Sequence, residues 1–122
     1  MIQKKTLVIG ASTNPARYSY KAIQSLENHK HPVLAYGLRK GTVNQIIIET
    51  ELPSFIENLD TITLYVGPSN QPPIYSDIIR LKPNRVIFNP GTENAELEEL
   101  LTTNNIAFER ACTLVLLSLG NY

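Results

Sequence analysis

Short apolar runs alternate along the chain with segments of helical periodicity. Runs rich in β-branched residues, most of them stopped by glycine, proline or asparagine, predict six β-strands, over residues 6–9, 31–36, 45–48, 61–66, 85–88 and 106–109. Some, such as Thr6-Leu7-Val8-Ile9, are apolar throughout instead of alternating with polar residues. This pattern is typical of strands in a parallel sheet that is covered on both faces.

Between these runs, apolar residues return at the spacing of a helix face. Tyr18, Ala22, Ile23 and Leu26 predict a buried stripe on a helix over 18–28. Further helices are predicted over 54–59, with Ser54 as the N-cap, and over 74–81, where a following proline ends the helix.

Two more helices are predicted in the last third of the chain. Residues 92–96 carry acidic side chains that suit the positive end of a helix dipole. Leu97, Leu100 and Leu101 are expected to form the buried stripe of that helix. Residues 114–119 predict a final helical turn or two.

Strands that alternate with helices through short connections predict an α/β fold. Right-handed crossovers then favour a Rossmann-like, doubly wound domain, with a mostly parallel sheet of five to six strands. The length suits one domain over residues 1–122. In such a sheet ligands bind outside the carboxyl ends of the strands. The loops after residues 9, 36, 66, 88 and 109 are therefore the candidate site.

Composition narrows the possible partners. The chain has 43% hydrophobic and 18% charged residues, which is ordinary for a folded domain. Its 11 basic and 11 acidic side chains give a formal net charge of zero, so no bulk attraction to nucleic acid or to anionic membranes is expected. A neutral total still permits a few cations at one site. The partner expected is a small nucleotide ligand, and the protein itself is expected to be a monomer or a homodimer.

Sequence features that direct a protein to other compartments are missing. One cysteine, Cys112, allows neither an internal disulfide nor a cysteine-based zinc site. The first residues lack the apolar region of a cleaved signal peptide, and no apolar run is long enough to span a bilayer. We therefore expect a cytoplasmic protein.

The loop after the first strand is the best phosphate site in the sequence. Gly10 permits a sharp turn, the next helix points free amides at the loop, and Arg17 adds a planar cation. The dinucleotide fingerprint G-x-G-x-x-G is incomplete, because Ser12 and Pro15 occupy its second and third glycine positions. The loop indicates phosphate more than NAD, and the alternative is an ordinary turn with a helix cap.

The loop after the second strand favours a phosphorylated ribose. An NAD site expects an acidic residue at this strand end, whereas here Gly37 is followed by Arg39 and Lys40, with no acid before Glu49. Both NADP and coenzyme A carry a ribose phosphate that such cations suit. Solvated loop charges are the alternative interpretation.

Two further turns complete the rim, at Gly67-Pro68 and at Asn89-Pro90-Gly91. Each suits the presentation of backbone amides to a ligand, and each is equally an ordinary connector between a strand and a helix.

No residue pattern indicates catalysis. His29 and His31 flank the start of a strand, at the opposite end of the sheet, and no histidine spacing supports a metal site. Ser12 lacks the nucleophile-elbow motif, and no pair of carboxylates is placed for acid–base work. Cys112 lies at the correct end of the sheet, although a lone cysteine among apolar residues more often serves as a small buried hydrophobe. Neither a catalytic residue nor a metal ligand is assigned.

The motif Val8-Ile9-Gly10-Ala11-Ser12-x-x-Pro15-x-Arg17-x-Ser19 resembles the opening of the small stand-alone CoA-binding proteins, which are similar to the N-terminal domain of the succinyl-CoA synthetase alpha subunit. The resemblance extends to the segments 60–62, 89–94 and 106–112. It implies a Rossmann-like fold that holds coenzyme A. It also implies that Gly10, Ser12, Pro15, Arg17 and Ser19 surround the pyrophosphate, and that the turns at 66–68 and 89–91 line the cleft.

We therefore expect a protein that binds CoA or acyl-CoA without catalysis of its own, as a sensor or as the partner of an enzyme. An NADP-binding, reductase-like enzyme and a protein-interaction module with a drifted, non-binding cleft are the alternatives. The candidate ligand-binding residues are Gly10, Ala11, Ser12, Thr13, Asn14, Pro15, Arg17, Tyr18, Ser19, Gly37, Arg39, Lys40, Gly67, Pro68, Asn89, Pro90 and Gly91.

Overall fold

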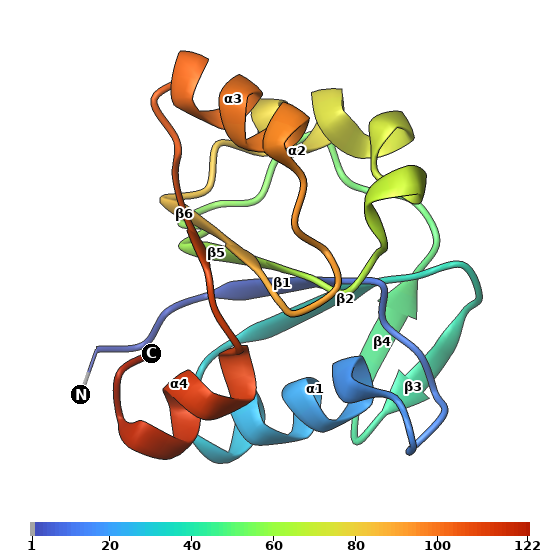
Figure 1. Ribbon diagram of the computed structural model, residues 1–122. Coiled ribbons are helices and arrows are strands. Elements are labelled where there is room, and N and C mark those ends of the chain that lie inside the picture. The colour runs from blue at the N-terminus through green and yellow to red at the C-terminus, as the bar shows by residue number, and fades with distance from the viewer. Residues whose placement is uncertain (1) are drawn as a thin grey trace.

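The computed structural model describes residues 2–122 and contains an α/β fold built on one mostly parallel sheet (Figure 1). Over these residues the strands lie in the order β3-β4-β2-β1-β5-β6-β7. Their bounds are β1 Thr6–Ile9, β2 Val33–Tyr36, β3 Gly41–Val43, β4 Ile46–Glu49, β5 Thr61–Leu64, β6 Arg85–Phe88 and β7 Ala107–Arg110. The predicted Rossmann-like fold is confirmed.

Helices cover the sheet on both faces (Figure 1). Helices α1 (Tyr18–Asn28) and α4 (Thr113–Leu119) lie side by side on one face, and α2 (Tyr75–Leu81) and α3 (Ala95–Thr103) lie on the other. Two short 3-10 helices, η1 (Pro68–Asn70) and η2 (Pro72–Ile74), precede α2. No helix within residues 2–122 has the length and apolar character needed to cross a membrane.

Each face of the sheet has its own apolar core. Val8 on β1 packs with Ile23, Leu26 and Leu117 from α1 and α4. The alternate residues of β1, Leu7 and Ile9, pack with the opposite layer, which includes α2 and α3. All four residues of β1 are buried, as are all four of β5, in accord with the apolar runs of these strands.

The sheet has seven strands where the sequence predicts five to six. The additional strand is β3, which pairs antiparallel with β4 in a hairpin and forms one edge of the sheet. Only one of its three residues, Val43, is buried, so it carries no apolar run. A strand this short escapes detection by periodicity.

The helix predicted over 54–59 does not form, and this expectation is wrong. Residues 50–60 cross from β4 to β5 as an irregular segment in which Ile56 and Leu59 are buried. Asn58 adopts a left-handed conformation with φ of 58°, which interrupts a helix. Six residues also give too few hydrogen bonds to offset helix nucleation. The apolar spacing here reflects burial of a loop.

Two helix stripes are narrower than predicted. Tyr18, the first residue of α1, is 68% exposed, and the Lys21 ammonium lies 5.3 Å from its ring centroid. Leu100 on α3 is also exposed, whereas Leu97 and Leu101 are buried as expected. Helix α3 starts at Ala95, since the Asn94 side chain caps it by accepting from the backbone N–H groups of Glu96 and Leu97.

Candidate functional site

The loop between β1 and α1 rests on the end of β2. The backbone N–H groups of Gly10 and Ala11 both donate to the Tyr36 carbonyl oxygen at 2.9 Å, and Gly10 has a φ of 94°. A Cβ atom added at Gly37 would lie 2.3 Å from the Ala11 carbonyl oxygen, closer than any side chain permits. Glycine at positions 10 and 37 therefore allows the loop to cross the sheet edge at close range.

Side chains inside this loop hold its shape. Ser12 Oγ accepts from the Asn14 N–H at 3.1 Å, and Asn14 Oδ1 accepts from the Ala16 N–H at 3.0 Å. Ser19 and Ala11 are buried, whereas Thr13, Pro15 and Arg17 are exposed. Of the residues predicted here, Thr13, Asn14, Pro15, Arg17 and Tyr18 are exposed, and Asn14 also helps to shape the loop together with the remaining ones.

The first turn of α1 is open to a ligand. Its N-cap residue is Arg17, which lies in an extended conformation and makes no side-chain capping hydrogen bond. The first backbone N–H groups of the helix consequently lack the partner that a serine or asparagine cap would supply. These donors, the helix dipole and the exposed Arg17 guanidinium together favour an anion at the carboxyl edge.

The loop after β2 extends beyond the sheet. Leu38 is 96% exposed, and Arg39 and Lys40 are exposed beside it. Neither cation belongs to an ion pair within the described chain. Both are thus placed at the carboxyl end of β2, as predicted, with their charges open to a ligand.

An acidic residue that the sequence reasoning placed outside the site also lies at this edge. Glu49 is the last residue of β4, which pairs with Tyr36 at the end of β2, and its carbonyl accepts from the Gly37 N–H at 2.9 Å. The β3–β4 hairpin turns the chain back so that a residue twelve positions after Gly37 adjoins it. The strand over 45–48 was predicted, but its parallel pairing with β2, which brings Glu49 to this edge, was not.

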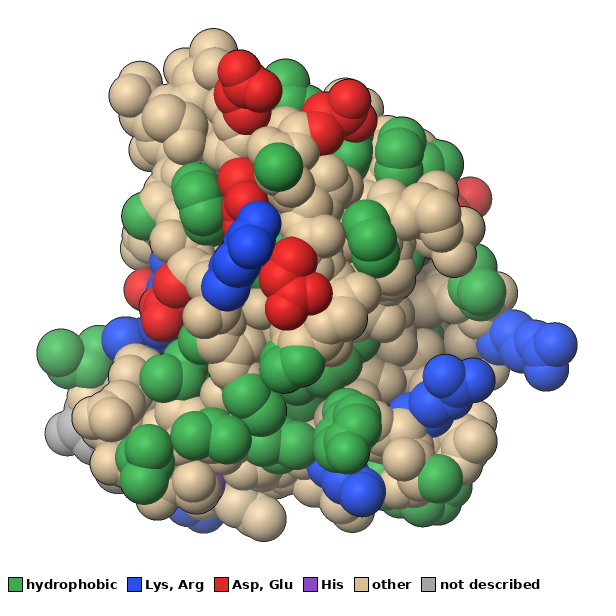
Figure 2. Space-filling view, viewed as in Figure 1, with side chains coloured by type: hydrophobic (Ala, Val, Ile, Leu, Met, Phe, Trp, Pro, Cys, Tyr) green, Lys and Arg blue, Asp and Glu red, His purple; other side chains and the backbone are tan. Residues whose placement is uncertain are grey.

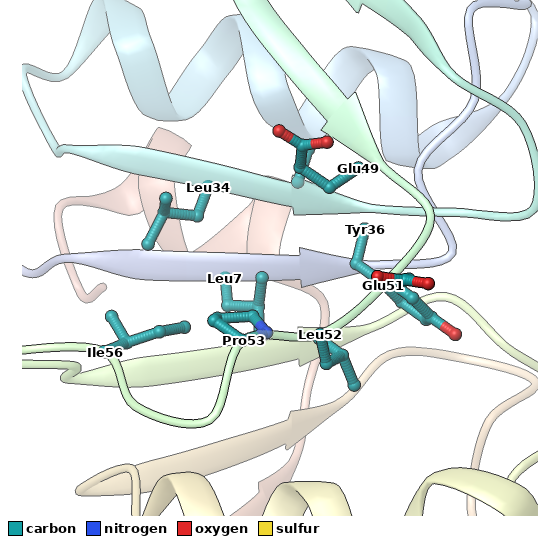
Figure 3. A pocket seen from close by; sticks show the side chains of 9 residues that line it. Leu7, Leu34, Tyr36, Glu49, Glu51, Leu52, Pro53 and Ile56 are labelled. Carbon is teal, nitrogen blue, oxygen red and sulfur yellow. The ribbon is translucent and has the colours of Figure 1, made fainter.

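A hollow of about 420 Å³ lies between β2 and the segment 50–60 (Figure 3). Its lining is mostly apolar, with Leu7 and Leu34 from the sheet facing Leu52, Pro53 and Ile56. Glu49 and Glu51 lie among the residues that line it. The irregular segment 50–60, where the predicted helix does not form, supplies one wall of the hollow.

Gln71 joins the two predicted rim turns. Its side chain is fully buried and its Nε2 donates to the carbonyl oxygens of Val66, at 2.9 Å, and Thr92, at 2.8 Å. Its Oε1 accepts from Asn94 Nδ2 at 2.9 Å. The turn at 66–68 is therefore fastened to the turn at 89–92. Sequence reasoning missed Gln71, since a single glutamine between prolines carries no pattern.

Asn89 has a structural role at the predicted site. Its Nδ2 donates to Thr63 Oγ1 at 2.7 Å and to the Leu64 carbonyl at 2.8 Å, while its Oδ1 accepts from the Thr113 N–H at 2.9 Å. The side chain is buried and its hydrogen bonds all go to the protein. Asn89 thus ties β5, β6 and α4 together beneath the cleft.

One backbone amide in the outer part of the turn at 89–91 already has a hydrogen-bond partner. The Gly91 N–H donates to Glu93 Oε1 at 2.9 Å, so one amide that the sequence suggests for a ligand is bound by a neighbouring carboxylate. Gly67, Pro68, Pro90 and Gly91 line the rim with little side chain, and a Cβ added at Gly67 or Gly91 would meet no atom within 4 Å.

Potentially reactive groups near the cleft are few. Cys112 is partly exposed where β7 gives way to α4. Burial raises the pKa of Tyr65, whose hydroxyl finds no hydrogen-bond partner within residues 2–122, so this phenol stays protonated. His31 lies at the amino end of β2, as expected, with its Nδ1 accepting from the Lys4 backbone N–H at 2.9 Å. Within the described residues, no three potential metal ligands converge.

The chain matches one family model and several solved structures. A family model described as a CoA binding domain matches residues 4–118. A crystal structure of an uncharacterised protein superposes with a TM-score of 0.96 at 48% sequence identity, and the match covers 100% of both chains. No protein of curated function shows significant similarity to the chain.

More distant solved structures share the fold alone. A protein from Thermus thermophilus has a TM-score of 0.85 at 19% identity, over 98% of this chain and 91% of its own. A hypothetical protein from Pyrococcus horikoshii OT3 has a TM-score of 0.79 at 20% identity, over 92% of this chain and 80% of its own.

Proposed function

Because the chain belongs to the CoA binding domain family, we propose that it binds coenzyme A or a CoA thioester at the carboxyl edge of the sheet, without catalysis of its own. The observation that carries the proposal is the uncapped start of α1 beside the β1–α1 loop and Arg17. This arrangement suits the pyrophosphate of the ligand. The protein would then serve as a sensor of CoA or as the partner of an enzyme.

The charges along the edge orient the ligand. With the pyrophosphate at α1, Arg39 and Lys40 at the end of β2 suit the 3′-phosphate on the ribose of CoA. The pantetheine arm then extends the other way, past the turns at 66–68 and 89–91. The strand order supports this direction, because β5, β6 and β7 follow β1 on the side away from β2.

Thermal unfolding with a set of nucleotides tests the proposal. A ligand whose free concentration is about 100 times its dissociation constant stabilises the fold by about 2.7 kcal/mol, which raises the Tm by several degrees. We expect CoA to give this shift, and dephospho-CoA, which lacks the 3′-phosphate, to give a smaller one. A shift with NADP and none with CoA would favour the reductase-like alternative. No shift with CoA, NADP, NAD or ATP at millimolar concentration would favour an interaction module.

Arg17→Ala tests the assigned pyrophosphate contact. Loss of a charge-assisted hydrogen bond to phosphate is expected to weaken CoA binding about tenfold to a hundredfold, measured by calorimetry. The Tm without ligand should stay near that of the wild type, since Arg17 is exposed. Lys21→Ala, one turn further along α1, is the matched control and should bind CoA as the wild type does. Equal affinity of the Arg17 variant and the wild type would remove Arg17 from the site.

A further inference from the structure

Helix α4 carries an uncharged apolar stripe on its outer side. Residues 111–120 contain no charged side chain, and Cys112, Val115, Leu116 and Leu119 follow the spacing of one helix face. Thr113 and Leu117 turn towards the core, whereas Val115 is 50% and Leu119 66% exposed. We call these four residues the α4 stripe. A helix that is apolar all round is ordinarily covered.

The surroundings of the stripe differ from the rest of the surface. Figure 2 shows apolar side chains gathered over α4 and continuing towards the start of α1, while acidic side chains lie over α3. The nearest cation in the chain, Arg110, is held by Glu98 through contacts of 2.7 and 2.9 Å. The hollow over β2 is also mostly apolar, but Glu49 and Glu51 are among the residues that line it. Of these two surfaces, the α4 stripe alone is free of charge.

The stripe begins where the proposed ligand ends. If the proposed function holds, the pantetheine arm runs from α1 along the ends of β5, β6 and β7. The Ala111 N–H donates to the Phe88 carbonyl at 3.1 Å, which fixes the chain between the ends of β6 and β7, and Cys112 follows directly. In the proposed orientation, the thiol end of the ligand would lie near Cys112, the first residue of the stripe.

The chemistry and length of the stripe identify its occupant. From Cys112 to Leu119 a helix rises about 10 Å. An extended alkyl chain of about eight carbons has a similar length, given C–C bonds of about 1.5 Å. We infer that the ligand is an acyl-CoA with an aliphatic acyl chain of medium length, and that this chain lies on the α4 stripe. The inference rests on the proposed function. Contact removes apolar surface of both partners from water, and no charged group is desolvated.

Calorimetry with CoA, acetyl-CoA, octanoyl-CoA and succinyl-CoA tests the inference. We expect octanoyl-CoA to bind at least about tenfold more tightly than acetyl-CoA, since several additional methylenes leave water. Succinyl-CoA, whose acyl group ends in a carboxylate, should show no such gain. The variant Val115→Ser/Leu119→Ser should lose the octanoyl gain and keep the affinity for CoA. The control Phe55→Ser removes an exposed apolar side chain far along the sequence and should retain the gain.

The outcomes separate the inference from the proposed function. If none of the four compounds binds, the proposed function fails and the inference fails with it. If CoA binds and octanoyl-CoA binds no more tightly than acetyl-CoA, the inference alone is wrong. A gain that survives in the Val115/Leu119 variant would place the chain elsewhere and overturn the inference. Light scattering that finds a dimer which this variant dissociates, without any octanoyl gain, would assign the stripe to a second copy instead.

Discussion

Single atoms decide how the β1–α1 loop lies on the sheet. Gly37 leaves room for the Ala11 carbonyl, and Gly41 leaves room for the Thr13 methyl group, where an added Cβ would lie 2.5 Å away. Gly10 meets the same restriction, with the Tyr65 carbonyl oxygen 2.7 Å from an added Cβ. The sequence indicated Gly10 as a turn residue and Gly37 as a candidate ligand-binding residue, but the close approach of two loops depends on coordinates that no motif contains.

Gly37→Ala should therefore displace the loop. The added methyl group forces the Ala11 carbonyl away from β2, and we expect the free energy of unfolding to fall by about 1–3 kcal/mol in urea titrations. Gly67→Ala is the matched control, because Gly67 has ordinary φ and ψ of −61° and 155° and open space around it. Its stability should stay within about 0.5 kcal/mol of the wild type. Equal losses in both variants would contradict the steric argument.

At the scale of elements, the strands were predictable and the connections less so. Apolar runs identified β1, β2, β4, β5, β6 and β7. The runs of β1, β5 and β6 reflect burial by the helices on both faces, whereas β7 has no buried residue. The hairpin strand β3 and the irregular segment 50–60 depend on contacts between distant residues, which short-range periodicity does not record. The candidate loops do follow the carboxyl ends of the strands, as expected, and their binding role stays a prediction. The fastening of the rim turns through Gln71 was missed because it too is a tertiary contact.

Gln71→Leu tests that fastening. Leucine has a similar volume but leaves the Val66 and Thr92 carbonyls without their partner. It also removes one of the two acceptors of Asn94 Nδ2, which keeps its bond to the Tyr75 hydroxyl. We expect a loss of about 2–4 kcal/mol in the free energy of unfolding, measured by urea titration. Asn70→Ala, an exposed neighbour, should change stability by less than about 0.5 kcal/mol. A stable Gln71 variant would show that the two turns hold their positions independently.

At the scale of the whole molecule, the amino end of the sheet is closed by residues from both ends of the chain. Lys4 Nζ donates to the Tyr122 carbonyl at 2.6 Å, and the Tyr122 hydroxyl lies 2.5 Å from Thr6 Oγ1. Arg85 and His31 both face the Tyr122 ring, with centroid distances of 4.5 and 4.9 Å. These contacts lie at the end of the sheet opposite the candidate site. They hold the two ends of the chain together and involve no residue of the candidate loops.

The closure makes stability depend on pH. Burial, together with the positive charges of His29, Lys4 and Arg85, lowers the pKa of His31 below its ordinary 6.5. As the pH falls below about 6.5, His31 is therefore protonated in the unfolded chain while it is still neutral in the folded chain. The free energy of unfolding falls as a result. The effect is absent above that pH, and it levels off once the folded ring is protonated. Urea titrations at pH 7.5 and 5.5 should show a smaller drop for His31→Gln than for the wild type. An identical drop would exclude His31.

The central place of β1 has a consequence for how the protein is made. Within this sequence β1 precedes every other strand, yet its two neighbours are β2 and β5, and the second pairing joins Thr6 to Thr61 and Ile9 to Leu64. Its apolar residues therefore stay without one of their partners until β5, more than 50 residues later, has been synthesised. Pairings over such separations slow folding, and the exposed segment is open to aggregation meanwhile. During translation, a strand that is fully buried in the finished protein therefore lacks one of its two neighbours until β5 is made.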